Sequence, residues 1–473
     1  MSSISERPDD FPDQFPAMLV KELRQGLRAK TFVIVFLILQ GLLGLILLVA
    51  SAGATSAHAG EKVSEIVFVF FSLTVLVVQP LRGIGALTGE IRGQTIDLMV
   101  LTRLSATRIV LGKWVAIVSQ SALIAATIFP YLILRYYFGG MALFPELALV
   151  LMVLFVSAAF TAITVGMSAS GSVIIRGILP IIAAGVLIVY IFGFGFSGKL
   201  LDLINVFTFT DGAKTCGLLA FIIGTIHISW CLLSLGSSAI APHAENHSSL
   251  RRVLALAVLI VTPLLLHGTG IHSTAAIGIW LALAALPVAS ALTENLTLIP
   301  SVATPFVRRG PLGKLAGRVL YPGWPSGVMF TVAVTCIAVL AQFFIFNTRT
   351  SSDLIFLIGA LGSLFLPGLL VILLGAKLKD RLAVFILTWA ITFALVMVMD
   401  AVTHGMSSRG VLWAFVWCPA MILPMSDIKE FSHHALIVTG LIVDCLYLGT
   451  MIVLAIAAQR QIREIESQAL PVE

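Results

Sequence analysis

Apolar runs of about 20 residues, the length at which a helix crosses a bilayer, recur from one end of the chain to the other. Twelve such runs are present, at 31–51, 63–84, 109–134, 143–168, 173–193, 215–237, 252–269, 274–293, 327–347, 353–376, 382–401 and 434–457. They lack the polar–apolar alternation of membrane β-strands. Because only helices and closed barrels span a bilayer, the pattern predicts an all-α polytopic membrane protein with about twelve transmembrane helices.

The composition agrees with this fold class. The chain is 59% hydrophobic and 11% charged, whereas a soluble domain carries about 25% charged residues. The net charge of +6 does not indicate a nucleic-acid partner, because basic residues of membrane proteins gather at the cytoplasmic ends of helices. The polar, acidic stretch 1–16 lacks a signal-peptide pattern, so no cleaved signal peptide is expected.

The basic residues also predict the orientation. Most of the 29 lysines and arginines fall on one side of the membrane when the N-terminus is placed in the cytoplasm, and this bias predicts that both termini are cytoplasmic. Two stretches, 194–214 and 410–425, are interrupted by Gly, charged residues or Pro. They are expected to form re-entrant or interfacial segments rather than spans.

The order of spans and loops repeats, which predicts two six-helix halves in parallel orientation. A cytoplasmic N-terminus, 1–30, precedes a first six-helix half, 31–240, whose long basic loop covers 85–113. A second six-helix half covers 241–457, and a cytoplasmic tail covers 458–473.

A basic amphipathic helix is predicted at 15–30, before the first span. Its leucines recur every fourth residue and therefore share a face, while its basic residues gather on the other side. These are Leu19, Leu23 and Leu27, and Lys21, Arg24 and Arg28. Such a helix suits the inner headgroup layer. The alternative interpretation is an ordinary positive flank of the first span.

The segment 89–114 is the most polar long stretch between two spans. Glu90, Gln94 and Asp97 are spaced i, i+4, i+7, so they share one face of a helix. Ser105 is predicted to cap the helix that re-enters the membrane. A cytoplasmic helix with polar and apolar faces suits docking of another protein or of the span ends, and the alternative is a solvated loop without a partner.

The residues of this segment resemble a known family. Glu90 to Leu98 (EIRGQTIDL), then Leu101 to Ser105 (LTRLS) and Ile109 to Lys113 (IVLGK) are similar to the cytoplasmic loop of ABC transporter permeases of the ABC-2 type. The preceding Lys-Glu-Leu-Arg, 21–24, is similar to the interfacial elbow helix of that family. Gln94 stands where the family usually has glycine. The resemblance covers about residues 15–240.

This resemblance implies a permease subunit of an ATP-driven exporter in the bacterial cytoplasmic (inner) membrane. A separate ABC ATPase would bind ATP and Mg²⁺ and push on the elbow helix and the loop. The residues implied in coupling are Glu22, Arg24, Glu90, Gly93, Thr95, Asp97, Thr102, Ser105, Gly112 and Lys113. Further expected partners are membrane lipid and, as an open alternative, a second permease copy.

No enzymatic activity and no cofactor are expected in this chain itself. Gly112-Lys113 is followed by Trp114, so the hydroxyl of a G-x-x-x-x-G-K-[ST] phosphate loop is missing. No catalytic arrangement is found, and no pair of cysteines has metal-ligand spacing, so the five cysteines are predicted to be small buried residues. Glu430 and His434, four residues apart, give a weak metal signal, for which the alternative is a solvated mouth of a span.

One carboxylate lies in mid-membrane. Asp444 is central in the last predicted span, where a charge costs roughly 2.5–3.5 kcal/mol on insertion scales. It is predicted either to form an intramembrane polar site with His227 or to be a hydrogen-bonded structural aspartate. The first interpretation keeps an ion-coupled secondary transporter as an alternative function. A non-transporting membrane scaffold is a further alternative.

Overall fold

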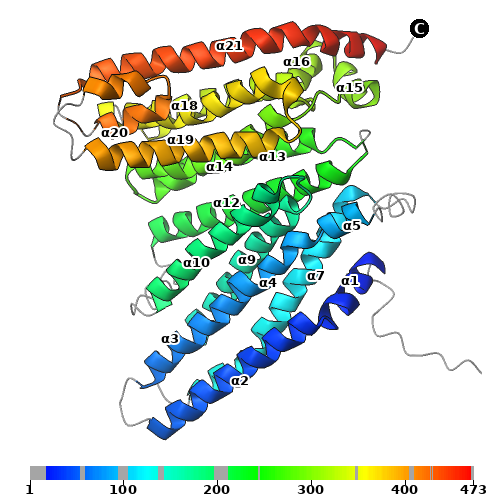
Figure 1. Cartoon of the computed structure of the whole chain (residues 1–473), viewed down its shortest axis with the longest axis vertical. Coiled ribbons are helices and arrows are strands. Elements are labelled where there is room, and N and C mark those ends of the chain that lie inside the picture. The colour runs from blue at the N-terminus through cyan, green and yellow to red at the C-terminus, as the bar shows by residue number, and fades with distance from the viewer. Residues whose placement is uncertain are drawn as a thin grey trace, which may run out of the picture. The chain divides into compact units, whose positions relative to one another are not determined.

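The computed structural model of the chain (Figure 1) describes residues 17–53, 59–93, 105–136, 143–195, 211–242, 245–346, 350–403, 410–426, 428 and 430–469. Every element assigned within these residues is helical. Twelve helical stretches among them are long and apolar enough to cross a membrane, and they overlap the twelve predicted runs one for one. The predicted all-α polytopic fold is therefore confirmed.

The chain divides into two compact units, which are described separately. Unit 1 comprises Met1–Thr208 and Leu235–Ile240, and unit 2 comprises Phe209–Ser234 and Ala241–Glu473. The long helix α12 (Gly212–Ile240) contributes to both units. The division into two six-helix halves at residue 240 stays a prediction.

Unit 1 is built around the packing of α7 on α9 and on the helical run that begins with α3. Its buried core includes Leu43, Phe71 and Ile124, each with no exposed surface. Its elements are α1 (Ala17–Leu27), α2 (Lys30–Gly53), α3 (Ala59–Ser72), the π-helix η1 (Leu73–Val78), α4 (Gln79–Leu81), η2 (Arg82–Gly85), α5 (Thr88–Arg92), α7 (Ala106–Thr127), α8 (Phe129–Tyr136), α9 (Leu143–Met167), η3 (Ile174–Ile178) and α10 (Leu179–Gly195).

Unit 2 is built around α14 and α18, which pack on each other and on α17, α19 and α21. After its part of α12, its elements are α13 (Ser248–Gly268), α14 (Ser273–Thr293), α15 (Pro300–Val307), α16 (Gly310–Leu320), α17 (Trp324–Leu340), η5 (Ala341–Ile345), α18 (Ser351–Leu374), η6 (Gly375–Lys377), α19 (Arg381–Thr403), η7 (Gly410–Phe415), η8 (Pro419–Met421), α20 (Ile422–Ser426) and α21 (His433–Gln468).

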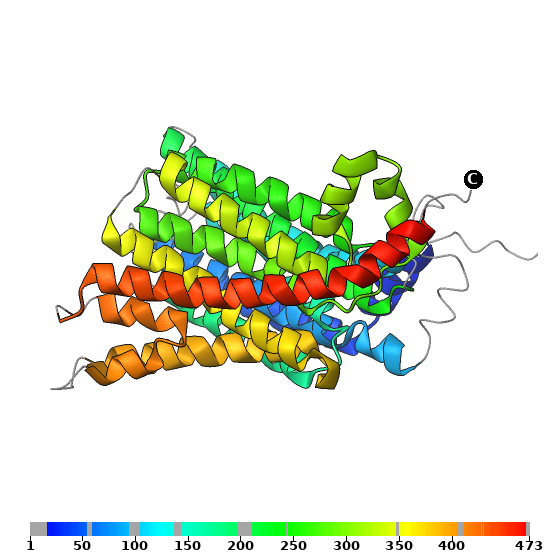
Figure 2. The same ribbon diagram turned by 90° about the horizontal axis from the view of Figure 1, so that it is seen from above.

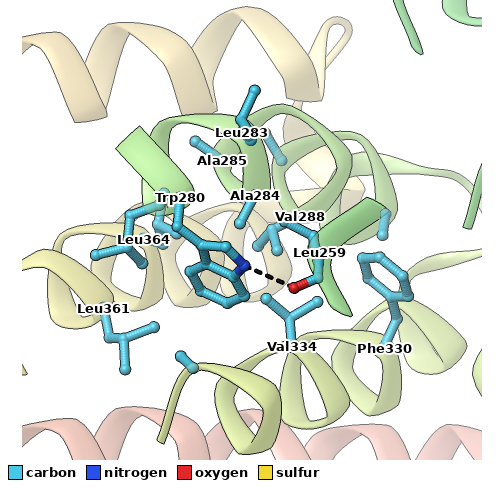
Figure 3. Packing of buried hydrophobic residues seen from close by; sticks show 14 of the residues in the cluster. Leu259, Trp280, Leu283, Ala284, Ala285, Val288, Phe330, Val334, Leu361 and Leu364 are labelled. Carbon is cyan, nitrogen blue, oxygen red and sulfur yellow. Dashed lines mark hydrogen bonds between the residues drawn. The ribbon is translucent and has the colours of Figure 1, made fainter. Parts of the chain in front are cut away.

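Prolines inside the long helices free carbonyl groups, which side chains of neighbouring helices satisfy. Pro263 lies inside α13, so the carbonyl of Leu259, four residues earlier, has no helical N–H donor. Trp280 of α14 donates from Nε1 to this oxygen at 2.8 Å and is 2% exposed, in the centre of the unit 2 core (Figure 3). An unpaired carbonyl in the bilayer would be costly, so this bond lets a proline occupy a span.

In α14, too, a side chain from a neighbouring helix takes the place of a missing helical N–H donor. Pro287 is inside this helix, which frees the carbonyl of Leu283. His227 of α12 hydrogen-bonds to this backbone group. His227 is 3% exposed, and its ring therefore has a structural partner within unit 2.

In unit 1 a proline leaves the carbonyl of Val75, in the π-helix η1, without a helical donor. In η1 the hydrogen bonds run from residue i+5 to residue i, as from the Gln79 N–H to the Thr74 carbonyl. The next donor in this register would be residue 80, which is Pro80 and has no N–H. Ser157 of α9 donates its hydroxyl to the carbonyl of Val75 at 2.6 Å instead.

Two interrupted segments, 194–214 and 410–425, are predicted not to span. The segment 410–425 is broken into η7, η8 and α20, each too short to cross a bilayer. It nevertheless packs within unit 2, where Met421 and Met425 are fully buried while Trp413 and Trp417 are exposed. The segment 194–214 lies mostly outside the described residues.

Helix α21 runs to Gln468 rather than ending at 457, so its length of about 54 Å exceeds the hydrocarbon thickness of about 30 Å.

Candidate functional site

Lys113 joins three separate segments of unit 1. Its Nζ donates to Oε1 of Glu22 in α1 and to Oε1 of Glu90 in α5, each at 3.0 Å. The side chain of Lys113 is 7% exposed, and those of the two glutamates are 16% and 17% exposed. Burial of an ammonium group is unfavourable unless it is paired, so the two carboxylates are what allow Lys113 to be shielded at the start of α7.

Two glycines bring α1 close to α7. An added Cβ on Gly26 of α1 would overlap the amide of Gln120 in α7. An added Cβ on Gly112 of α7 would touch Met18 of α1, at 3.4 Å from Cγ. Glu22 and Gly26 are four residues apart and therefore share the face of α1 that meets α7. This contact places Glu22 beside Lys113, and α1 lies along α7 in Figure 1.

Arg82 contacts the C-terminal end of α1 and connects it to neighbouring helices. Its guanidinium donates to the side-chain oxygens of Gln79, at 2.8 Å, and of Gln120. It also reaches the Gly26 carbonyl at 3.5 Å and lies 5.6 Å from the ring centroid of Phe32. Carbonyls in the last turn of a helix lack helical donors, so a cation there is favourable.

The beginning of α5 is tied to the end of α9. The Leu87 N–H donates to the hydroxyl of Ser168 at 3.1 Å, and the Thr88 hydroxyl donates to the Ser168 carbonyl at 2.5 Å. Leu87 itself is fully buried. These bonds fix the position of α5, and therefore the position of Glu90, relative to the spans.

The structure places the other residues implied in coupling as follows. Gly112 lies in the α1–α7 contact, and Arg24 is exposed on α1. Gly93 is the C-cap of α5, with an ordinary φ of −77°. Ser105 is the N-cap of α7, but its side chain makes no capping hydrogen bond, so the predicted cap bond is wrong. The remaining three, Thr95, Asp97 and Thr102, lie outside the described residues.

A second shielded charge cluster occurs in unit 2. Glu294 follows α14 and accepts hydrogen bonds from Arg251 and Arg252 of α13, the latter at 2.7 Å. Both arginines are 1% exposed. The Glu294 carboxylate also accepts from the Ser248 hydroxyl at 2.8 Å and from the Gly323 N–H at 3.2 Å. The cluster therefore links α13, the end of α14 and the start of α17.

Glu294 is held in its ionised form. Burial alone would raise the pKa of this carboxyl, but the attraction of Arg252 and Arg251, with the bonds from Gly323 and Ser248, outweighs burial and lowers the pKa below 4.5. Local spacing could not identify the two arginines as partners of Glu294, because they precede it by 43 and 42 residues.

The predicted pairing of Asp444 with His227 does not occur. No ion pair or hydrogen bond joins these two residues of unit 2, whose surroundings the structure describes. His227 instead hydrogen-bonds to the backbone of Leu283 and contacts Cys231 Sγ at 3.8 Å. Asp444 is 7% exposed, and its Oδ1 has no hydrogen-bond partner. This oxygen faces Gly362 of α18, where an added Cβ would overlap both Asp444 and Pro419.

Unit 1 also contains an open apolar pocket of about 170 Å³ between α3, η1, α9 and α10. Phe68, Leu76, Val153 and Ile191 contribute to its lining. Within the described residues, no cluster of His, Cys, Asp or Glu could hold a metal ion.

No protein-family model, no curated protein and no solved structure matches this chain. Its function is therefore inferred from the arrangement of its own residues.

Proposed function

We propose that this chain is the permease subunit of an ATP-driven exporter of the ABC-2 type, in the bacterial cytoplasmic (inner) membrane with both termini cytoplasmic. It would form the translocation pathway, while a separate ATPase subunit binds ATP and Mg²⁺. The observation that carries the proposal is the position of Lys113, whose ammonium contacts Glu22 of α1 and Glu90 of α5 at 3.0 Å each.

The contacts of α1 and α5 with α7 could transmit a displacement of the cytoplasmic segments to the membrane spans. Lys21 and Arg28 are exposed on the face of α1 that does not contact α7, so they are accessible to an acidic surface of a partner. A displacement of α1 or α5 would act on α7 through Lys113, Gly26 and Gly112. Helix α7 forms most of the candidate span Ala106–Ile133 and packs on α9. Packed helices move as discrete elements, so a shift at one end is carried along the span.

The proposal is tested by co-expression with a candidate ABC ATPase, followed by co-purification and measurement of ATP hydrolysis in vesicles. Glu90→Arg is expected to abolish stimulation of ATP hydrolysis by the permease, because it places a second cation beside Lys113. The matched control is Glu464→Arg, since Glu464 is exposed on α21, far along the chain from the cluster. Equal ATPase binding and stimulation by wild type and Glu90→Arg would exclude the coupling role.

Ion-coupled transport is a second candidate, which rests on Asp444. Its buried Oδ1 has no hydrogen-bond partner, and intramembrane carboxylates often mark ion or proton pathways. Under this alternative, transport persists when ATP is depleted and is lost in Asp444→Asn. Transport that requires ATP and survives Asp444→Asn would reject it.

A further inference from the structure

Helix α16 presents large apolar side chains to its surroundings. Leu312 is 80% exposed and Leu315 is 63% exposed. They are three residues apart on the helix, so they share a face, and Ala316 on the same face is also exposed. An exposed leucine pair on a short helix outside the spans calls for an apolar environment that covers it.

The opposite face of α16 is already occupied. Gly310, with φ of 75°, makes the turn between α15 and α16. An added Cβ on Gly313 would overlap the carbonyl of Phe306, and one on Gly317 would overlap the ring of Tyr321. Phe306 and Tyr321 pack edge to face, with ring centroids 5.2 Å apart. The hairpin of α15 and α16 is therefore closely packed, and the exposed leucines point away from its contacts.

The hairpin is anchored at the ends of spans. It lies between α14, which ends at Thr293, and α17, which begins at Trp324. The Tyr321 hydroxyl donates to Oε1 of Glu466 in α21 at 3.3 Å. A small apolar cluster, including Val302 of α15 and Ile462 of α21, also joins these elements. Figure 2 shows the yellow-green hairpin beside the end of the red helix α21.

The charge of the hairpin indicates what covers the leucines. The segment 295–323 contains no acidic residue. Its basic residues are Arg308, Arg309, Lys314 and Arg318. Arg308 and Arg309 are exposed at the turn that precedes Leu312. A leucine face with lysine on the other side of the helix and exposed arginines at the preceding turn is typical of helices that lie in the headgroup region of anionic membranes.

We propose that α16 is an interfacial helix that binds anionic lipid. Leu312 and Leu315 would insert among the acyl chains, and Arg308, Arg309 and Lys314 would contact lipid phosphates. The flanking spans α14 and α17 hold the helix at the membrane surface, so a lipid surface is within reach at both ends of the segment. This inference does not depend on an ATPase partner.

The test uses the full chain in vesicles of phosphatidylcholine alone and of phosphatidylcholine with phosphatidylglycerol. In a background with the five native cysteines replaced by alanine, a nitroxide is attached at Ala316→Cys, which keeps both leucines. The control label is at Gln461→Cys, an exposed position on α21. Collision with oxygen and with a water-soluble nickel chelate reports the depth of each label.

We expect the Ala316→Cys label to lose nickel accessibility and gain oxygen accessibility when phosphatidylglycerol is present, while the control label stays accessible to nickel. Replacing Arg308 and Arg309 by glutamine should reverse most of this shift, as should Leu312→Ser with Leu315→Ser. Equal depth in both kinds of vesicle, or a label accessible to nickel in both, would overturn the assignment. Protection that occurs only when a soluble ATPase is added would identify a protein-docking face instead and would also overturn it.

Discussion

Lys113 and Glu90 form an ion pair at 3.0 Å although they lie on different helices on either side of a polar loop, with 7% and 17% of their side chains exposed. Removing the cation would leave Glu22 and Glu90 shielded and facing each other. Lys113→Ala is therefore expected to lower the free energy of unfolding by about 1–3 kcal/mol, and Lys113→Arg to retain most of it. The measurement is denaturant unfolding in detergent, with Lys21→Ala on the exposed face of α1 as the control. An equal loss in Lys113→Ala and the control would contradict the structure.

Trp280 and Pro263 are expected to be energetically coupled. Trp280→Phe removes the donor to the Leu259 carbonyl, which Pro263 deprives of its helical partner. The loss should be about 2–4 kcal/mol, for an unsatisfied buried carbonyl plus reduced packing. Pro263→Ala restores a helical N–H, so Trp280→Phe should be less destabilising in that background. A double-mutant cycle of unfolding free energies measures this difference, and strict additivity would argue against the compensation.

A glycine contact in unit 2 gives a matched pair of substitutions. An added Cβ on Gly327 of α17 would overlap the backbone carbonyl of Ala291 in α14, whereas one on Gly185 of α10 meets nothing within 4 Å. Gly327→Ala should force the two helices apart, since backbone cannot move aside as a side chain can, and lower stability by about 2 kcal/mol or more. Gly185→Ala should be neutral or stabilise by up to about 1 kcal/mol, from helix propensity. Similar melting temperatures for the two variants would argue against the close approach of α14 and α17.

The sequence was sufficient to predict the spans, because about 20 consecutive apolar residues leave few alternatives in a bilayer. It also indicated α1, whose leucines are partly buried and whose basic residues are exposed. The hydrogen-bond and ion-pair partners of the polar side chains were harder to predict than the spans. Arg82 and Gln120 are 38 residues apart, and Arg251 and Glu294 are 43 apart, so no local spacing connects them.

His227 illustrates the same limit. One prediction from the sequence pairs it with Asp444, because His227 lies in mid-span in the helix of the first half that corresponds to the last predicted span. The sequence does indicate that the Leu283 carbonyl lacks a helical donor, because Pro287 follows it by four residues. Which neighbouring helix would supply the donor depends on helix packing, and hydropathy contains no information about it.

Glu294 should make stability depend on pH in the acid range. The attraction of Arg252 and Arg251 outweighs burial, so the pKa of this carboxyl lies below 4.5 in the folded protein. The unfolded chain therefore takes up the proton first as the pH falls. The stabilisation is fully present above about pH 4.5 and is lost as the pH falls through the lowered folded pKa. Glu294→Gln should lower the free energy of unfolding by about 3–5 kcal/mol at neutral pH, because it leaves two buried arginines without their carboxylate.

The wild-type and Glu294→Gln curves of unfolding free energy against pH should therefore converge on acidification. The difference between the two curves isolates this carboxyl from the others that titrate in the same range. Glu464→Gln, an exposed carboxyl on α21, serves as the control and should run parallel to wild type. A Glu294→Gln difference that stays constant across the acid range would show that the ionised form of Glu294 is not what stabilises the cluster.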